Sequence, residues 1–171
     1  PTPVPQVRLE KVRGLYLTPG TVGYPSKVRH YVDLANKTEI NAYVIDIKGD
    51  LGEICYETGV DLALETDAWK RIYDVSYVID MFHKNNIRVI GRIVCFNDAN
   101  MAVKKPELAI KDKKGNVFKI GIQNGYLAWL DPSNENTWEY IADIAKEAKS
   151  LGFDEIQFDY VRFPETTLYD Y

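Results

Sequence analysis

FDEIQFDYVRFP, residues 153–164, has the period-two pattern of a β-strand and decides which fold the chain is expected to adopt. Its side chains separate into an apolar set, Ile156, Phe158 and Tyr160, and a polar set, Glu155, Gln157 and Asp159. A strand of a parallel sheet that is covered on both faces reads as a nearly continuous apolar run. The polar set therefore predicts a second face that looks onto a shared, partly polar interior.

Three other segments have strand character, at 12–18, 42–48 and 87–96, and they alternate with helical patterns. The first helix is expected from about Ser26, as its cap, to about Thr38. The second has apolar residues from Val75 to Phe82 at helical spacing. Alternating strands and helices favour parallel strands joined by right-handed crossovers, so the predicted class is α/β.

The third helix is introduced by Pro132 and Ser133, with Asp131 or Asn134 as its cap, and Gly152 is expected to close it. The side chains expected on its buried face are Trp138, Ile141, Ala145 and Ala148. Before this helix, residues 108–120 place two β-prone arms around a Lys-Gly-Asn turn, which predicts a hairpin.

The position of the polar residues on each strand distinguishes a barrel from an open sheet. In the strand 42–48, Asp46 lies opposite the apolar face, and the same rule points Tyr16, Thr18 and Arg92 inward from their strands. A barrel explains these mixed faces, because barrel active sites form from inward residues at the carboxyl ends of the strands. A plain sheet with one solvated face is the alternative.

Four strand–helix units are half of a (β/α)8 barrel, which usually needs ~250 residues. The predicted fold is therefore the first half of a (β/α)8 TIM-type barrel, over residues 12–171, preceded by a proline-rich, linker-like tail, residues 1–11. We expect the chain to be part of a longer protein. Its exposed strand edges would be covered by self-association or by pairing with the missing half-barrel.

Composition excludes several classes of protein. The 171 residues are 46% hydrophobic and 27% charged, which suits one globular unit. The net charge is −4 and there is no basic run, so nucleic acid is not an expected partner. No apolar stretch approaches the ~20 residues of a membrane-spanning helix.

No motif for a cofactor or a metal is present, and none is expected. Cys55 and Cys95 lack metal-ligand spacing and are expected to be two free thiols. Asp50, Glu53 and Asp98 follow predicted strands and carry the oxygen ligands that a metal would need. Acidic residues of loops are usually solvated, which is the expectation for these three.

Asp46 and Asp159 are the candidate catalytic residues, because both are predicted at the carboxyl ends of even-numbered strands. Two strand spacings of ~4.8 Å allow their carboxyl groups to approach within the ~5 to 9.5 Å of glycosidase pairs. Arg92 and Arg162 are the candidate cations that would keep one carboxylate ionised. The alternative is that Asp46, Arg92 and Asp159 form an internal ion-pair network that fixes strand register.

Aromatic side chains near the predicted strand ends suit a sugar site, because pyranose rings stack on flat rings. They are Tyr16, Tyr24, Phe96, Tyr126, Trp129 and Tyr160. The substrate-binding residues that we predict combine this set with polar side chains of the inward face: Tyr16, Arg92, Trp129, Gln157 and Arg162.

The chain also resembles, in order over residues 12–165, an uncharacterised bacterial domain family assigned to the glycoside hydrolases. The likeness is carried by the segments VRGLYLTPG, NAYVIDIKGDLGEICY, IRVIGRIVCFNDANMAVKKPELAIKDKKG and AWLDPSNENTWEYIADIAKEAKSLGFDEIQFDYVRFP. The pairing of WLDPSN with FDEIQFDYVRFP makes it specific. This family is a (β/α)8 barrel distantly similar to α-amylase-type glycosidases, and it occurs in secreted or cell-wall-associated proteins.

The resemblance implies a hydrolase that acts on a polysaccharide or oligosaccharide, outside the cell or at the cell wall. Asp159 matches the position of a catalytic carboxylate in α-amylase-type enzymes, whose proton donor comes from the next strand. Because fold does not imply function, a non-catalytic carbohydrate-binding or cell-wall-associated barrel domain is the alternative.

Overall fold

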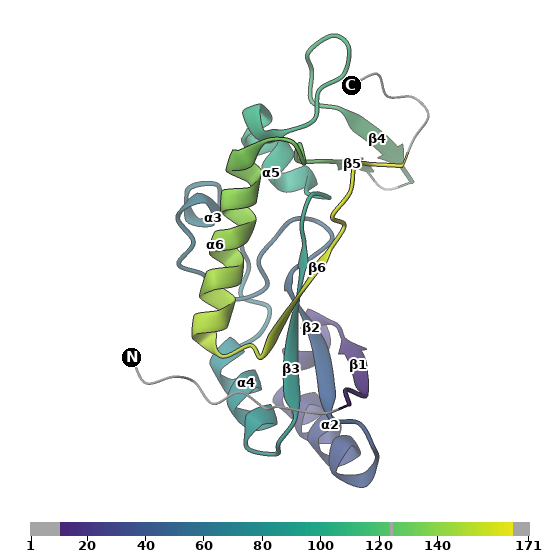
Figure 1. Cartoon of the computed structure of the whole chain (residues 1–171), viewed down its shortest axis with the longest axis vertical. Coiled ribbons are helices and arrows are strands. Elements are labelled where there is room, and N and C mark those ends of the chain that lie inside the picture. The colour runs from purple at the N-terminus through teal and green to yellow at the C-terminus, as the bar shows by residue number, and fades with distance from the viewer. Residues whose placement is uncertain (1–10, 124, 166–171) are drawn as a thin grey trace.

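The computed structural model describes residues 11–123 and 125–165 of the chain. Four strands form one parallel sheet in the order β1-β2-β3-β6, joined by helices (Figure 1). The strands are β1 (Gly14–Leu17), β2 (Ala42–Lys48), β3 (Arg88–Val94) and β6 (Glu155–Asp159). The predicted α/β class is confirmed, with four parallel strands that alternate with helices as in part of a TIM-type barrel.

Three helices connect these strands: α2 (Pro25–Lys37), α4 (Val75–His83) and α6 (Glu135–Leu151). The apolar face of β2 lies in the core, where the side chains of Tyr43, Ile45 and Ile47 are fully buried. Gly91 of β3 allows close packing in this core, because a Cβ atom there would lie 2.2 Å from Cδ1 of Ile47. The remaining helices are short: α1 (Pro19–Val22), α3 (Asp61–Glu65), α5 (Ala99–Lys104) and the 3-10 helix η1 (Pro106–Leu108).

The predicted N-cap of the first long helix is wrong by two residues. Helix α2 begins at Pro25, and its N-cap, Tyr24, makes no side-chain capping bond. Proline is favoured in the first turn because its fixed φ is helical and its missing N–H is not needed there. Ser26 therefore lies inside the helix rather than capping it.

Helix α6 follows the prediction at both ends and, apart from Trp138, on its buried face, where Ile141 and Ala148 are buried as expected. The Asn134 side chain accepts a hydrogen bond from the N–H of Asn136, and Gly152 closes the helix with a left-handed φ of 111°. Trp138 is 50% exposed, so the expectation that it packs inward is wrong. Its indole N–H donates to the carbonyl of Pro132 instead, and Tyr140 occupies the buried face.

Between β3 and α6 the chain forms two hairpins. The predicted one is confirmed by a bridge between Lys111 and Val117, with Gly115 at a φ of 84°. A second hairpin, β4 (Lys119–Ile122) with β5 (Gly125–Ala128), was not predicted. Figure 1 shows both above the carboxyl end of β3.

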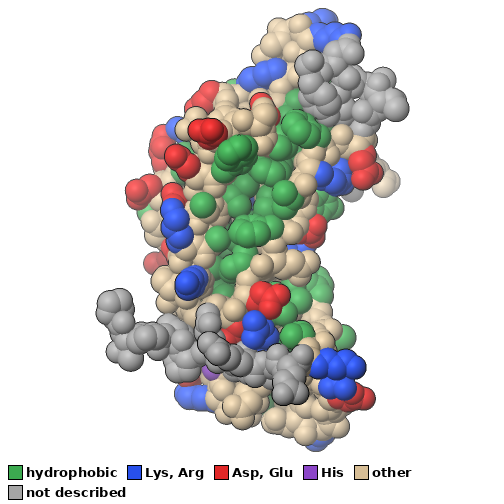
Figure 2. All heavy atoms as spheres, viewed as in Figure 1, with side chains coloured by type: hydrophobic (Ala, Val, Ile, Leu, Met, Phe, Trp, Pro, Cys, Tyr) green, Lys and Arg blue, Asp and Glu red, His purple; other side chains and the backbone are tan. Residues whose placement is uncertain are grey.

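The edge strands carry apolar side chains at the surface, as expected for half of a barrel. Leu15 of β1 is 43% exposed and Phe158 of β6 is 51% exposed, followed by the exposed Val161 and Phe163. Figure 2 shows hydrophobic side chains gathered in a band along the middle of one face of the molecule. Covering of these edges by self-association or by a second half-barrel stays a prediction. In the described residues, no helix combines the length and the apolar character needed to cross a membrane.

Candidate active site

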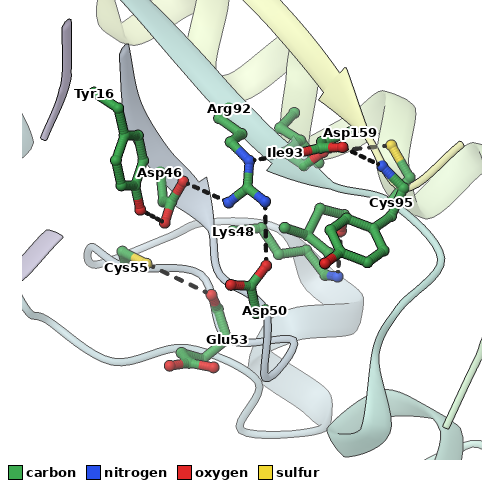
Figure 3. Close-up of polar contacts among 12 residues, drawn as sticks. Tyr16, Asp46, Lys48, Asp50, Glu53, Cys55, Arg92, Ile93, Cys95 and Asp159 are labelled. Carbon is green, nitrogen blue, oxygen red and sulfur yellow. Dashed lines mark hydrogen bonds and ion pairs between the residues drawn. The ribbon is translucent and has the colours of Figure 1, made fainter. Parts of the chain in front are cut away.

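Arg92 of β3 lies at the centre of a polar cluster on the inward face of the sheet (Figure 3). Its guanidinium contacts three carboxylates: Nε lies 2.7 Å from Asp159, Nη1 2.9 Å from Asp46, and Nη2 3.1 Å from Asp50. Only 13% of the Arg92 side chain is exposed. The structure therefore brings together the three residues that sequence reasoning placed on one face, and it adds Asp50.

The register between neighbouring strands explains why these side chains meet. Asp46 is the partner of Arg92 across β2 and β3, and Gln157 is its partner across β3 and β6. Asp159 pairs with Val94, two residues further toward the carboxyl end. Because side chains alternate along a strand, residues two apart share a face. The exposed Gln157 thus lies on the same face as Asp159, beside Arg92.

Asp46 forms the floor of the cluster. Its side chain is 5% exposed, Oδ1 accepts from Arg92, and Oδ2 accepts the hydroxyl proton of Tyr16 at 2.6 Å. Burial, and then the hydrogen bond to Asp46, raise the pKa of Tyr16, so its hydroxyl stays protonated and remains a donor. Half of Tyr16 is exposed. Asp46 therefore orients Arg92 and Tyr16 rather than facing solvent.

Asp159, in contrast, has 38% of its side chain exposed. Burial by itself would raise the pKa of this carboxyl group, but hydrogen bonds from Arg92 and from the backbone N–H of Tyr160 outweigh it and lower the pKa. Tyr160 has a φ of 54°, a left-handed conformation that is uncommon for residues other than glycine. The chain thus turns sharply just after an ionised, accessible carboxylate.

Asp98 was expected to be a solvated loop acid, and this expectation is wrong. Lys48 Nζ lies 2.9 Å from Asp98 Oδ2, and neither side chain has any exposed surface. Lys48 also donates to the carbonyl of Val94, and Asp98 caps α5 by accepting from the N–H of Met101. Sequence reasoning missed this buried pair, which joins the last residue of β2 to the loop after β3.

Trp129 does not offer the sugar-stacking surface that the sequence predicted. It is 3% exposed and packs against Tyr160, with a distance of 6.3 Å between ring centroids. The guanidinium carbon of Arg162 lies 5.8 Å from the Trp129 ring and 5.3 Å from the Tyr160 ring. Trp129 is thus covered by residues that follow Asp159 in the chain. Arg162 is 41% exposed and lies 3.7 Å from Glu165.

Cys55 and Cys95 are buried free thiols, as predicted. Within the described ranges, no group of three or more His, Cys, Asp or Glu side chains is arranged to hold a metal ion. The chemistry that the cluster itself offers is that of carboxylates held by one guanidinium.

A parallel strand–helix sheet with carboxylates at the strand ends defines the class as part of an α/β TIM-type barrel of the kind that glycosidases use. The chain belongs to the family described as "Putative glycosyl hydrolase domain", whose model matches residues 14–171. No curated protein matches it. A crystal structure of a hypothetical protein from Ruminiclostridium thermocellum is 53% identical, with a TM-score of 0.83, over 88% of this chain and 78% of that one.

More distant structures share the fold. An α-galactosidase from Thermus thermophilus has a TM-score of 0.60 at 19% identity, over 91% of this chain and 33% of that one. A maltogenic α-amylase from Thermotoga neapolitana has a TM-score of 0.57 at 18% identity, over 85% and 38%. A Flavobacterium johnsoniae chitobiase has a TM-score of 0.61 at 20% identity, over 86% and 23%. This chain thus spans less than half the length of each of these three glycosidases.

Proposed function

We propose that this chain carries part of the active site of a glycoside hydrolase acting on a polysaccharide or oligosaccharide, with Asp159 as the catalytic carboxylate. The observation that carries the proposal is the state of Asp159, which Arg92 keeps ionised while more than a third of its side chain stays exposed at the carboxyl end of β6. An ionised carboxylate there can attack an anomeric carbon or activate a water.

The charge of the cluster supports this chemistry. Asp46, Asp50 and Asp159 surround one guanidinium, so these four side chains carry a net charge of −2 when the carboxylates are ionised. Glycoside hydrolysis passes through an oxocarbenium-like transition state with developing positive charge. Preorganised negative charge stabilises such a state more than it stabilises the neutral sugar.

Other side chains have supporting roles in the proposal. Asp46 orients Arg92, and Tyr16 and Gln157 supply hydrogen-bonding groups on the same inward face. Arg162 adds positive charge that lowers the pKa of Asp159 further. The proton donor has to be a residue other than Asp159, because hydrogen bonds from Arg92 and from the N–H of Tyr160 lower the pKa of Asp159.

The family resemblance supports a cell-wall or secreted setting for this activity, and hence a wall or storage polysaccharide as the substrate. We therefore propose an extracellular location.

The test is a screen of the protein for release of reducing ends from wall and storage polysaccharides, with Asp159→Asn beside it. We expect this variant to lose activity on the order of 10²–10⁴-fold. Glu155→Gln is the matched control, because Glu155 pairs with Arg88 across the same two strands. Undiminished hydrolysis by Asp159→Asn would rule out its catalytic role. Binding without hydrolysis by the unmodified protein would favour the carbohydrate-binding alternative.

A further inference from the structure

Asp50 is the most exposed of the three acids that surround Arg92. Its side chain is 61% exposed, compared with 38% for Asp159 and 5% for Asp46. Oδ1 accepts from Arg92 Nη2 at 3.1 Å. Within the described part of the chain no hydrogen bond or ion pair engages its other oxygen, Oδ2. One oxygen is thus anchored by the site, and the other is open to a ligand.

The turn that carries Asp50 is held in a fixed position. The N–H of Gly49 donates to the carbonyl of Glu53, and the N–H of Gly52 donates to the carbonyl of Gly49. Gly52 has a φ of 96° and lies against Asp98, where a Cβ atom would fall 1.9 Å from Oδ1. Asp98 is itself fixed by the buried ion pair with Lys48, directly before the turn. The position of Asp50 is therefore built by the fold.

Asp50 and Asp159 contact the same guanidinium, that of Arg92. Both accept hydrogen bonds from nitrogens of one guanidinium, so the two contacting oxygens lie closer together than the ~9.5 Å upper limit of glycosidase carboxylate pairs. Figure 3 shows Asp50 and Asp159 on different sides of the Arg92 guanidinium. A sugar whose anomeric carbon contacts Asp159 therefore lies beside the guanidinium that also holds Asp50.

We propose that Asp50 is a substrate-binding residue whose open oxygen accepts hydrogen bonds from ring hydroxyls of the sugar that Asp159 attacks. This inference rests on the proposed function and deepens it. The ligand class is an uncharged pyranose, because the net charge of −2 around Arg92 would repel the carboxylate of a uronic acid. A carboxylate is a strong acceptor for such hydroxyls, since one partner of each bond is charged.

The experiment is a double-mutant cycle between the protein and the sugar. The probes are p-nitrophenyl gluco-, galacto- and mannopyranosides of both anomers, their monodeoxy analogues, and p-nitrophenyl glucuronide. Wild type, Asp50→Asn and the control Glu155→Gln are compared by kcat/KM. Glu155 suits this purpose because its carboxylate is 51% exposed and forms an ion pair of the same 3.1 Å length, with Arg88, at the amino ends of β3 and β6.

We expect Asp50→Asn to lower kcat/KM about 10- to 100-fold on the hydroxylated sugar, the size of a hydrogen bond to a charged group. The loss should be much smaller on the analogue that lacks the hydroxyl bound by Asp50, and the control should show no such difference. An equal loss on every analogue, or faster hydrolysis of the glucuronide than of the neutral sugars, would overturn the inference.

The cycle also separates this inference from the proposed function. If wild type hydrolyses none of the probes or polysaccharides, the proposed function fails, and the same comparison is made on dissociation constants from titration calorimetry. Weaker binding of a neutral glycoside by Asp50→Asn than by wild type would then support the binding role. Equal dissociation constants, or no binding by wild type, would overturn it.

Discussion

Replacement of Lys48 by methionine tests how the fold positions the candidate site. Methionine retains an apolar side chain of similar length but removes the ammonium that lies 2.9 Å from Asp98 and donates to the carbonyl of Val94. Because both charged side chains are fully buried, the variant leaves the Asp98 carboxylate without its cation in a site that water does not reach.

The expected cost at pH 7 is about 3–5 kcal/mol in free energy of unfolding, the range for removing one partner of a buried ion pair. For a domain of this size that corresponds to a fall in Tm of roughly 10 °C. The double variant Lys48→Met/Asp98→Asn should recover most of the loss, because the amide carries no charge and its oxygen can still accept from the N–H of Met101.

The loss of stability in Lys48→Met should also depend on pH. Burial raises the pKa of Asp98 in the folded protein, and Lys48 partly opposes this rise. A folded-state pKa above the unfolded value gives stability that is complete below the unfolded pKa, near ~3.9, and is lost as pH rises toward the folded pKa. Removing Lys48 raises the folded pKa further. The difference in free energy of unfolding between wild type and Lys48→Met is therefore largest at neutral pH and becomes smaller toward pH ~4.

Urea denaturation of wild type, Lys48→Met and the double variant, followed by circular dichroism at pH 7 and at mildly acidic pH, measures these differences. The reasoning is refuted if Lys48→Met stays within ~1 kcal/mol of wild type at pH 7, or if its deficit is the same at both pH values.

Two further predictions concern the cluster and the core. Arg92→Lys offers a single ammonium in place of a guanidinium that contacts Asp46, Asp50 and Asp159. The pKa of Asp159 should therefore rise, and the acid limb of the pH–rate profile should move to higher pH. An acid limb at the same pH as in wild type would show that Arg92 does not set the pKa of Asp159. Gly91→Ala should cost about 1–3 kcal/mol by overpacking against Ile47 and Phe153, measurable by urea denaturation, and a variant as stable as wild type would contradict the tight packing at that position.

The strands could be predicted because their patterns are long and regular. The structure places β2 at the predicted residues 42–48, where buried Tyr43, Ile45 and Ile47 alternate with the other face. The short helices α1, α3 and α5 have four to six residues, too few for a helical period to be visible in the sequence. They form because surrounding residues pack against them, which a local pattern does not encode.

The same distinction holds for the site. Asp46, Arg92 and Asp159 could be predicted to meet because strand periodicity fixes their direction. Lys48, the last residue of the apolar strand 42–48, carries no local sign that its ammonium is buried, because its partner Asp98 belongs to the loop after β3. Trp129 was misjudged for a similar reason, since its burial depends on Tyr160 and Arg162, which follow β6.

An internal network that only fixes register would be expected to be buried and balanced in charge, because unpaired buried charge is costly. Asp46 meets this description, being buried and held on both oxygens by Tyr16 and Arg92. Asp159 and Asp50 do not, since both are substantially exposed and both accept hydrogen bonds from the one guanidinium that also holds Asp46. Asp46 is therefore the structural part of the cluster, and we infer that the two exposed acids are the part that meets a sugar.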